Sequence, residues 1–153
     1  MLRVAGRGDA DALGAVMHDA VRLGPSRYTQ AQRAAWSPAP RSGAAWTERL
    51  AAQHVVLDEG RDGVRGFMSL ADGGYIDFAY IRPGHRGTGL FRRLFSAVRA
   101  EAERRGARVL RTHASLMAEP AFAAMGFHVL RRETVAVDDE RLARAEMAMR
   151  LRD

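Results

Sequence analysis

The sequence predicts a single α/β domain over residues 1–153, with a mixed, mostly antiparallel sheet flanked by helices. Between residues 54 and 81, three apolar runs are separated by two glycine-rich turn signals, a pattern typical of an antiparallel three-stranded meander. Residues 90–105 then repeat apolar side chains at i, i+4 and i+8, which predicts a long amphipathic helix. The next apolar run, 108–113, should form a strand parallel to the one before the helix, through a right-handed crossover.

The N-terminal third predicts one strand and three helices. The expected elements are a strand at 2–5, a helix from Asp9 or Asp11 to Val21, a shorter helix at 29–36 and one or two helical turns at 46–52. Asp9 or Asp11, and Thr29, are expected helix caps, because their side chains accept hydrogen bonds from unpaired N–H groups at a helix start. Proline cannot continue a helix, so Pro25 and Pro38 mark where the first two end.

The rest of the chain completes the sheet without a repeat, a linker or a low-complexity segment. The meander strands are expected at 54–57, 64–70 and 75–81, a short helix at 119–125, and a final antiparallel pair of strands at 128–137 and 146–151.

The stretch from Tyr80 to Gly106 suggests a ligand site. A strand feeds the basic loop Arg86-Gly87-Thr88-Gly89, and the loop opens the long helix. In such an arrangement the loop N–H groups and the positive end of the helix dipole point at one place, and glycine allows a ligand to approach closely. This pattern predicts a phosphate-binding loop. The alternative is a strand-to-helix turn that needs glycine only for its backbone conformation.

The formal net charge is +6, and all 24 basic residues are arginine. Such a charge suits either nucleic acid or an anionic small ligand in a positive cleft. The arginines are spread along the chain and interleaved with acidic residues, so we expect a small ligand and not nucleic acid as the main partner.

Composition also limits the chemistry. The absence of cysteine excludes disulfides and thiolate catalysis. The histidines lack metal-ligand spacing, so we predict no metal. No apolar run approaches roughly 18 residues and the first residues lack the apolar block of a signal peptide, so we expect a cytoplasmic protein without membrane association.

Two segments resemble motifs of the GNAT superfamily of acyl-CoA-dependent N-acetyltransferases. Ile81-Arg82-Pro83-Gly84-His85-Arg86-Gly87-Thr88-Gly89 resembles the Q/R-x-x-G-x-G/A signature with its upstream aliphatic and proline positions. Ala121-Phe122-Ala123-Ala124-Met125-Gly126-Phe127 resembles the segment ending in Gly-Phe after the fifth strand. The resemblance covers essentially the whole chain and implies a sheet whose central strands splay apart.

The resemblance also implies a cofactor site for acetyl-CoA, used as a co-substrate. Loop amides from Arg86 through Phe91 would hold the pyrophosphate, with the arginine side chain adding charge. The pantetheine arm would lie between the splayed strands, and a backbone N–H near Tyr80 or Ile81 would polarise the thioester carbonyl. The residues expected at this site are Tyr80, Ile81, Arg86, Gly87, Thr88, Gly89, Leu90, Phe91, Ser115 and Phe122.

For Ser115, a hydrogen bond to the pantetheine and a cap on the following helix are both open. Asp77, Tyr80 and His113 are the candidate catalytic residues, since the attacking amine must be neutral and a base should face the splayed strands. Asp77 is either a general base or the partner of an arginine, and His113 is either an acid or base or a structural histidine.

The helical region that covers the acceptor side in this family contains Tyr28, Trp36 and Trp46. They form either an aromatic wall for the amine or ordinary packing.

Two positions depart from the family pattern. Phe91 stands where the signature ends in a small residue, and Phe122 stands where many members carry a tyrosine that reprotonates the leaving thiolate. Taken as a whole, the resemblance implies an N-acetyltransferase acting on a small-molecule or peptide primary amine through a ternary complex. A domain that binds acyl-CoA without turnover and a basic nucleic-acid-associated protein are the alternatives. The resemblance also allows a homodimer through the last strands.

Overall fold

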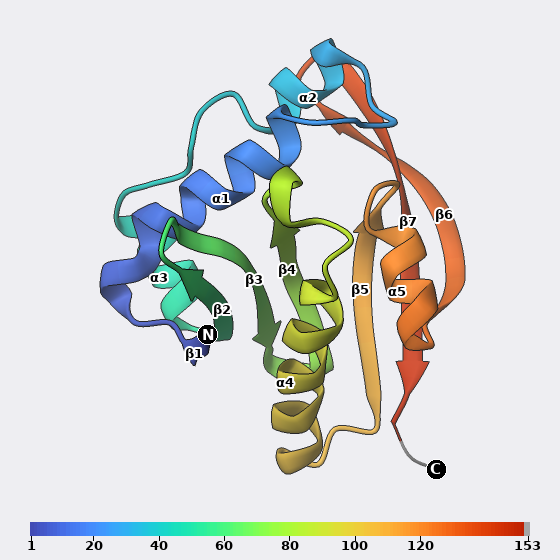
Figure 1. Cartoon of the computed structure of the whole chain (residues 1–153). Coiled ribbons are helices and arrows are strands. Elements are labelled where there is room, and N and C mark those ends of the chain that lie inside the picture. Colours follow the sequence, from blue (N-terminus) through green and yellow to red (C-terminus); the bar gives the residue numbers. More distant parts are fainter. Residues whose placement is uncertain (152–153) are drawn as a thin grey trace.

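The computed structural model describes residues 1–151 and confirms the predicted order of elements (Figure 1). These are β1 (Leu2–Val4), α1 (Ala10–Arg22), α2 (Gln30–Trp36), α3 (Ala44–Ala51), β2 (His54–Gly60), β3 (Gly63–Ala71), β4 (Tyr75–Ile81), α4 (Leu90–Arg104), β5 (Val109–Ser115), α5 (Glu119–Met125), β6 (His128–Val137) and β7 (Glu140–Arg150). Thr29 caps α2 as expected: its hydroxyl accepts from the N–H of Gln32, whose side chain accepts from the N–H of Thr29.

The strands form one sheet in the order β1-β2-β3-β4-β5-β7-β6. Only the pairing of β4 with β5 is parallel, so the predicted mixed, mostly antiparallel sheet and its crossover are confirmed. The last strand was predicted to begin at Glu146, which is wrong: β7 begins at Glu140. Asp138 and Asp139 form a tight turn in which Val137 already pairs with Glu140, and Asp138 adopts a φ of 52°.

Helices cover both faces of the sheet. On one face α1 and α3 pack against β2, β3 and β4, around a buried cluster that includes Leu13, Trp46 and Phe78. On the other face α4 and α5 cover the sheet over a second cluster that includes Leu94 and Met147. The apolar stripe of α4 predicted from the sequence is the buried face of that helix.

β4 and β5 diverge because β4 contains a bulge. Ile76 pairs with Leu70, but Ala79 already pairs with Met68, so β4 has one residue more than β3 over this interval. The bulged backbone is stabilised by Ser69, whose buried hydroxyl accepts from the N–H of Phe78 at 2.9 Å.

Only two residue pairs join β4 to β5, Tyr75 with Arg111 and Ile76 with Thr112. Beyond them the strands separate toward their carboxyl ends, and the gap between their ribbons is visible in Figure 1. The splayed central strands expected from the resemblance are confirmed.

None of the helices in residues 1–151 is both long enough and apolar enough to span a membrane.

Candidate active site

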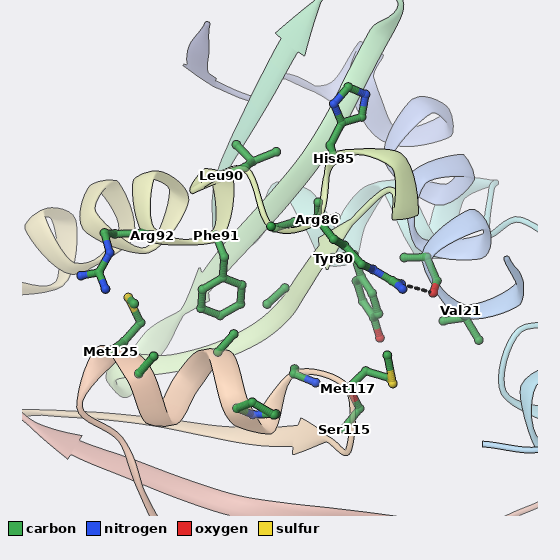
Figure 2. A pocket seen from close by; sticks show the side chains of 18 of the residues that line it. Val21, Tyr80, His85, Arg86, Leu90, Phe91, Arg92, Ser115, Met117 and Met125 are labelled. Atoms are coloured by element: carbon green, nitrogen blue, oxygen red, sulfur yellow. Dashed lines mark hydrogen bonds between the residues drawn. The ribbon is translucent and has the colours of Figure 1, made fainter. Parts of the chain in front are cut away.

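A cavity of about 420 Å³ lies at the carboxyl ends of the splayed strands, between the start of α4 and α5 (Figure 2). Its wall includes Ala79, Tyr80 and Ile81 of β4, His85, Arg86, Gly87 and Gly89 of the loop, Leu90, Phe91 and Arg92 of α4, Ser115 of β5, Met117 after it, and Trp36 of α2. Most of this wall is apolar. Within the described part of the chain, no carboxylate side chain belongs to it.

The start of α4 presents a series of unpaired amides to this cavity. From Gly87 to Arg92, no backbone N–H makes a hydrogen bond within residues 1–151, and the ladder of α4 begins with the N–H of Arg93. Gly87 and Gly89 have φ angles of 74° and 82°, which side-chain-bearing residues rarely adopt. The two glycines thus let the loop turn sharply into the start of α4.

The Arg86 side chain points away from the start of α4 (Figure 2). Its guanidinium donates to the carbonyl of Ala20 at the end of α1 at 2.8 Å and to that of Pro25 at 3.4 Å. Figure 2 shows the side chain turned toward α1. Burial lowers the pKa of Arg86, and the nearby charge of Arg33 lowers it further. The backbone of Arg86 belongs to the loop, whereas its side chain fastens the loop to α1.

Phe91 and Phe122, the two departures from the family pattern, are in contact. Their rings meet edge to face with centroids 5.0 Å apart and planes at 87°. Phe122 is 2% exposed and makes a similar contact with Phe127. In Figure 2 the ring of Phe91 extends from α4 toward α5. The bulky side chain therefore leaves the helix start and does not cover the unpaired amides.

Tyr80 is the one candidate catalytic residue in the cavity wall. Its ring is partly buried and lies 6.2 Å from that of Trp36. Burial raises the pKa of Tyr80, and the charge of Asp77 raises it further, while Arg41 opposes the shift. Tyr80 is therefore protonated at neutral pH and offers a hydroxyl proton.

Asp77 lies outside the wall, against α3. Its carboxylate, 15% exposed, accepts two hydrogen bonds from Arg49 at 2.9 and 3.1 Å and one from Gln53 at 2.7 Å. Of the two alternatives left by the sequence, the geometry is that of an arginine partner.

His113 also lies outside the wall. Its Nδ1 is 2.7 Å from the Tyr75 hydroxyl and its Nε2 is 3.6 Å from Glu146. These contacts hold His113 near the end of the gap where β4 and β5 are still paired.

Among the aromatic residues proposed for the acceptor, only Trp36 lines the cavity. Trp46 is buried, and its indole N–H donates to the Ala10 carbonyl at 2.8 Å. Tyr28 is 7% exposed and uses its hydroxyl to bridge two backbone groups. Ser115 does line the cavity, and its hydroxyl accepts from the N–H of Ala118 at 3.1 Å.

Several wall residues had no signal in the sequence. Ala20, Val21 and Ser26 come from the end of α1 and the turn after it, and Met117 follows β5. They are ordinary apolar or turn residues. The packing of α1 beside the loop brings the first three to the cavity, and the end of β5 brings Met117.

The sequence model of a known family, described as an acetyltransferase (GNAT) domain, matches residues 25–150. The chain belongs to the GNAT acetyltransferase family. It is therefore an acetyltransferase by family, and the fold expected from the resemblance is confirmed.

Among solved structures, the GCN5-related N-acetyltransferase "Aminotransferase, Class-II" from Rhodopseudomonas palustris is 30% identical, with a TM-score of 0.90 over 99% of this chain and 95% of that one. The yncA protein of Salmonella typhimurium with its cofactor acetyl-CoA is 23% identical, with a TM-score of 0.71 over 100% and 94% of the two chains. A phosphinothricin acetyltransferase from Sinorhizobium meliloti in complex with acetyl-CoA is 19% identical, with a TM-score of 0.74 over 99% and 88%. No curated protein matches the sequence significantly.

Proposed function

We propose that this GNAT acetyltransferase moves the acetyl group of acetyl-CoA to a primary amine through a ternary complex. The observation that carries the proposal is the series of unpaired amides from Gly87 to Arg92 at the mouth of the cavity. Amides at a helix start bind phosphate well because they are aimed together and the helix dipole adds positive potential. The exposed Arg92 adds a cation at the same rim, and among residues 1–151 no carboxylate that would repel a pyrophosphate lines the wall.

The cavity behind these amides suits the pantetheine arm. Its wall is mostly apolar, and it opens between β4 and β5 where no backbone pairing joins the two strands. Ser115, at the end of β5, would offer its hydroxyl proton to the arm while its oxygen keeps the bond to Ala118.

The backbone geometry favours Ile81 over Tyr80 as the group that polarises the thioester. The N–H of Arg82 donates to the carbonyl of Arg65 on β3 at 2.9 Å. Successive amides of a strand point to opposite sides, so the N–H of Tyr80 also faces β3 and that of Ile81 faces the gap toward β5. An N–H fixed in a place with little water is well suited to stabilise developing negative charge on the carbonyl oxygen.

Acetyl-CoA supplies the acetyl group as a thioester, which a neutral amine converts to an amide with release of the coenzyme thiol. Phe122 cannot deliver the proton that the leaving sulfur requires. We assign that role to Tyr80, because it stands in the cavity wall and its phenol is protonated at neutral pH. The phenol would recover its proton, through solvent, from the attacking nitrogen.

The acceptor should be a small amine that is not a polycation. Trp36 gives the acceptor side an aromatic surface. Polycations are usually held by clusters of carboxylates, and the described wall contains none.

Two measurements test the proposal. Calorimetric titration should detect acetyl-CoA binding, and thiol release should be faster with at least one small primary amine than with a polyamine of similar size. Binding without thiol release from any amine would favour the domain that lost turnover. Failure to bind acetyl-CoA would refute both ideas, and salt-sensitive retention on DNA would then be required for the nucleic-acid alternative.

A further inference from the structure

The turn between α1 and α2, residues 23–29, crosses the end of the gap between β4 and β5 where the two strands are apart. We call this turn the strap. The end of the gap that it crosses is the open end of the splay, and the end where the strands pair is the closed end. One side of the strap contacts the loop after β4, and the other contacts the segment after β5. The two strands themselves share no backbone pairing at this end. Their separation there must therefore be set by other elements. One is the ring contact between Phe91 on α4 and Phe122 on α5, and another is the strap, which touches both the loop after β4 and the segment after β5.

On the β4 side, the strap packs closely on the loop. Gly24 has a φ of 74°, and a Cβ at this position would meet Pro83 Cβ at 2.8 Å. Arg86 donates to Pro25 in the strap and to Ala20 just before it. The buried Arg33 donates to the carbonyl of Gly24 at 2.9 Å. The contacts of Gly24 with Pro83 and of Arg86 with Pro25 join the strap to the loop, and Arg33 joins the strap to α2.

On the β5 side, the attachment depends mainly on one hydroxyl. The Tyr28 hydroxyl accepts from the N–H of Leu116 at 2.8 Å, directly after β5, and donates to the carbonyl of Ala143 on β7 at 2.6 Å. A weaker contact joins the N–H of Arg27 to Met117 Sδ at 3.4 Å. Figure 1 shows α2, which follows the strap, above the open ends of β4 and β5 and beside β6 and β7.

We propose that Tyr28 is a positioning residue that fixes the separation of β4 and β5 at the cavity. The inference rests on the proposed function, since the sulfur and the carbonyl of the thioester would lie between these strands. Removing the hydroxyl leaves the N–H of Leu116, directly after β5, and the carbonyl of Ala143, on β7, without this partner. The strap then stays attached to the β4 side and loosens from the β5 side.

The Tyr28 hydroxyl bonds to Leu116 and Ala143 and not to the cofactor loop, which keeps its own contacts with the strap through Pro83 and Arg86. A change at Tyr28 should therefore alter the alignment of the reacting groups more than it alters cofactor affinity. A misplacement of about 1 Å can reduce a rate by about 100-fold.

Tyr28→Phe tests the proposal, with Tyr75→Phe as the matched control. Both changes delete one hydroxyl of a partly or fully buried tyrosine, but the Tyr75 hydroxyl bonds to His113 at the closed end of the splay. We expect Tyr28→Phe to keep the dissociation constant of acetyl-CoA within about twofold and to lower kcat by about tenfold or more. Tyr75→Phe should leave both nearly unchanged, and its loss of thermal stability provides the reference for a purely structural effect.

A second readout does not use activity. The chain has no cysteine, so spin labels can be attached only where cysteines are introduced, at Gly84 after β4 and at the exposed Ala123 on α5. The label-to-label distance distribution should widen in Tyr28→Phe and not in Tyr75→Phe. If Tyr28→Phe does not fold, Arg86→Gln, which loosens the other side of the strap, should give the same widening.

Equal distance distributions and equal kcat in the two tyrosine variants would overturn the proposal. A wider distribution in a protein that binds no acetyl-CoA would instead support the strap and refute the proposed function.

Discussion

The two ends of the gap between β4 and β5 are held together in different ways. At the closed end, strand pairing is reinforced by neighbouring side chains: the Thr112 hydroxyl donates to the carbonyl of Ile76 at 2.9 Å, and Tyr75 bonds to His113. At the open end the strands are not paired, and the two sides are linked by the ring contact of Phe91 with Phe122 and by the strap, which is attached through the Tyr28 hydroxyl. Side chains at the closed end should therefore affect stability, whereas those at the open end should affect binding and turnover.

The largest expected effect is at the open end. Gly89→Glu places a carboxylate where the pyrophosphate should bind, so the affinity for acetyl-CoA should fall by about 100-fold or more, as for a charge opposed to a helix-terminus anion site. Calorimetric titration measures this. Gly106→Glu is the matched control, because Gly106 also has a positive φ and open space around its Cα but follows the other end of α4. Similar affinities in the two variants would remove the loop from the cofactor site.

A smaller effect is expected at the closed end. Thr112→Val keeps the shape of a buried side chain and removes its hydrogen bond to Ile76, so the free energy of unfolding should fall by about 1–2 kcal/mol. Urea denaturation measures the loss, and acetyl-CoA affinity should stay within about twofold. Thr47→Val removes an exposed hydroxyl of α3 and should cost less than about 0.5 kcal/mol. A large change in affinity with Thr112→Val would mean that the two ends are not independent.

A still smaller effect is expected at Asp77. Because Arg49 and Gln53 occupy its carboxylate, Asp77→Asn should lower kcat by less than about threefold without shifting the pH–rate profile. The free energy of unfolding should fall by no more than about 1 kcal/mol, since Arg49 is about half exposed. A large loss of turnover that is greatest at low pH would restore Asp77 as the general base.

The tyrosines at both ends of the gap between β4 and β5 should make the free energy of unfolding depend on pH. Burial is the main cause that raises the pKa of Tyr28 at the open end, of Tyr75 at the closed end and of Tyr80 in the cavity wall. Above about pH 10, the unfolded chain loses phenolic protons that the folded chain keeps, so the free energy of unfolding should fall as pH rises. Tyrosinate absorbance should then increase together with unfolding. Ionisation of all three residues near pH 10 in the folded protein would contradict this.

Most of the fold could be predicted from local patterns. Thr29 and Gln32 form a complete capping box within four residues, and the stripe of α4 repeats over four turns, so both helices were clear from the sequence. The start of β7 was missed because the turn at Asp138 and Asp139 has no glycine. The bulge opposite Ser69 depends on pairing between two strands, which no local pattern encodes.

The site was less predictable because the partners of its side chains are distant in sequence and meet only in the folded structure. The loop glycines were found from their spacing, but the direction of the Arg86 side chain depends on carbonyls about 60 residues away in sequence. Likewise, the partner of Asp77 is one of 24 arginines and lies on another element. The sequence marked Gly24 and Pro25 of the strap as the end of a helix and Tyr28 as a candidate acceptor residue, but it gave no sign that this turn contacts both strand ends.

The contact between Phe91 and Phe122 has a consequence for any attempt to move this chain toward the usual family pattern. The two positions should behave epistatically, with a coupling on the order of 1 kcal/mol. Shortening Phe91 alone leaves an empty space beside a buried ring, and adding a hydroxyl to Phe122 alone places a polar group among packed aromatic rings. Only the double exchange, with a small residue at position 91 and tyrosine at position 122, removes the Phe91 ring and makes room for the tyrosine hydroxyl. We therefore expect each single variant to be a poorer enzyme than either the parent or the double variant.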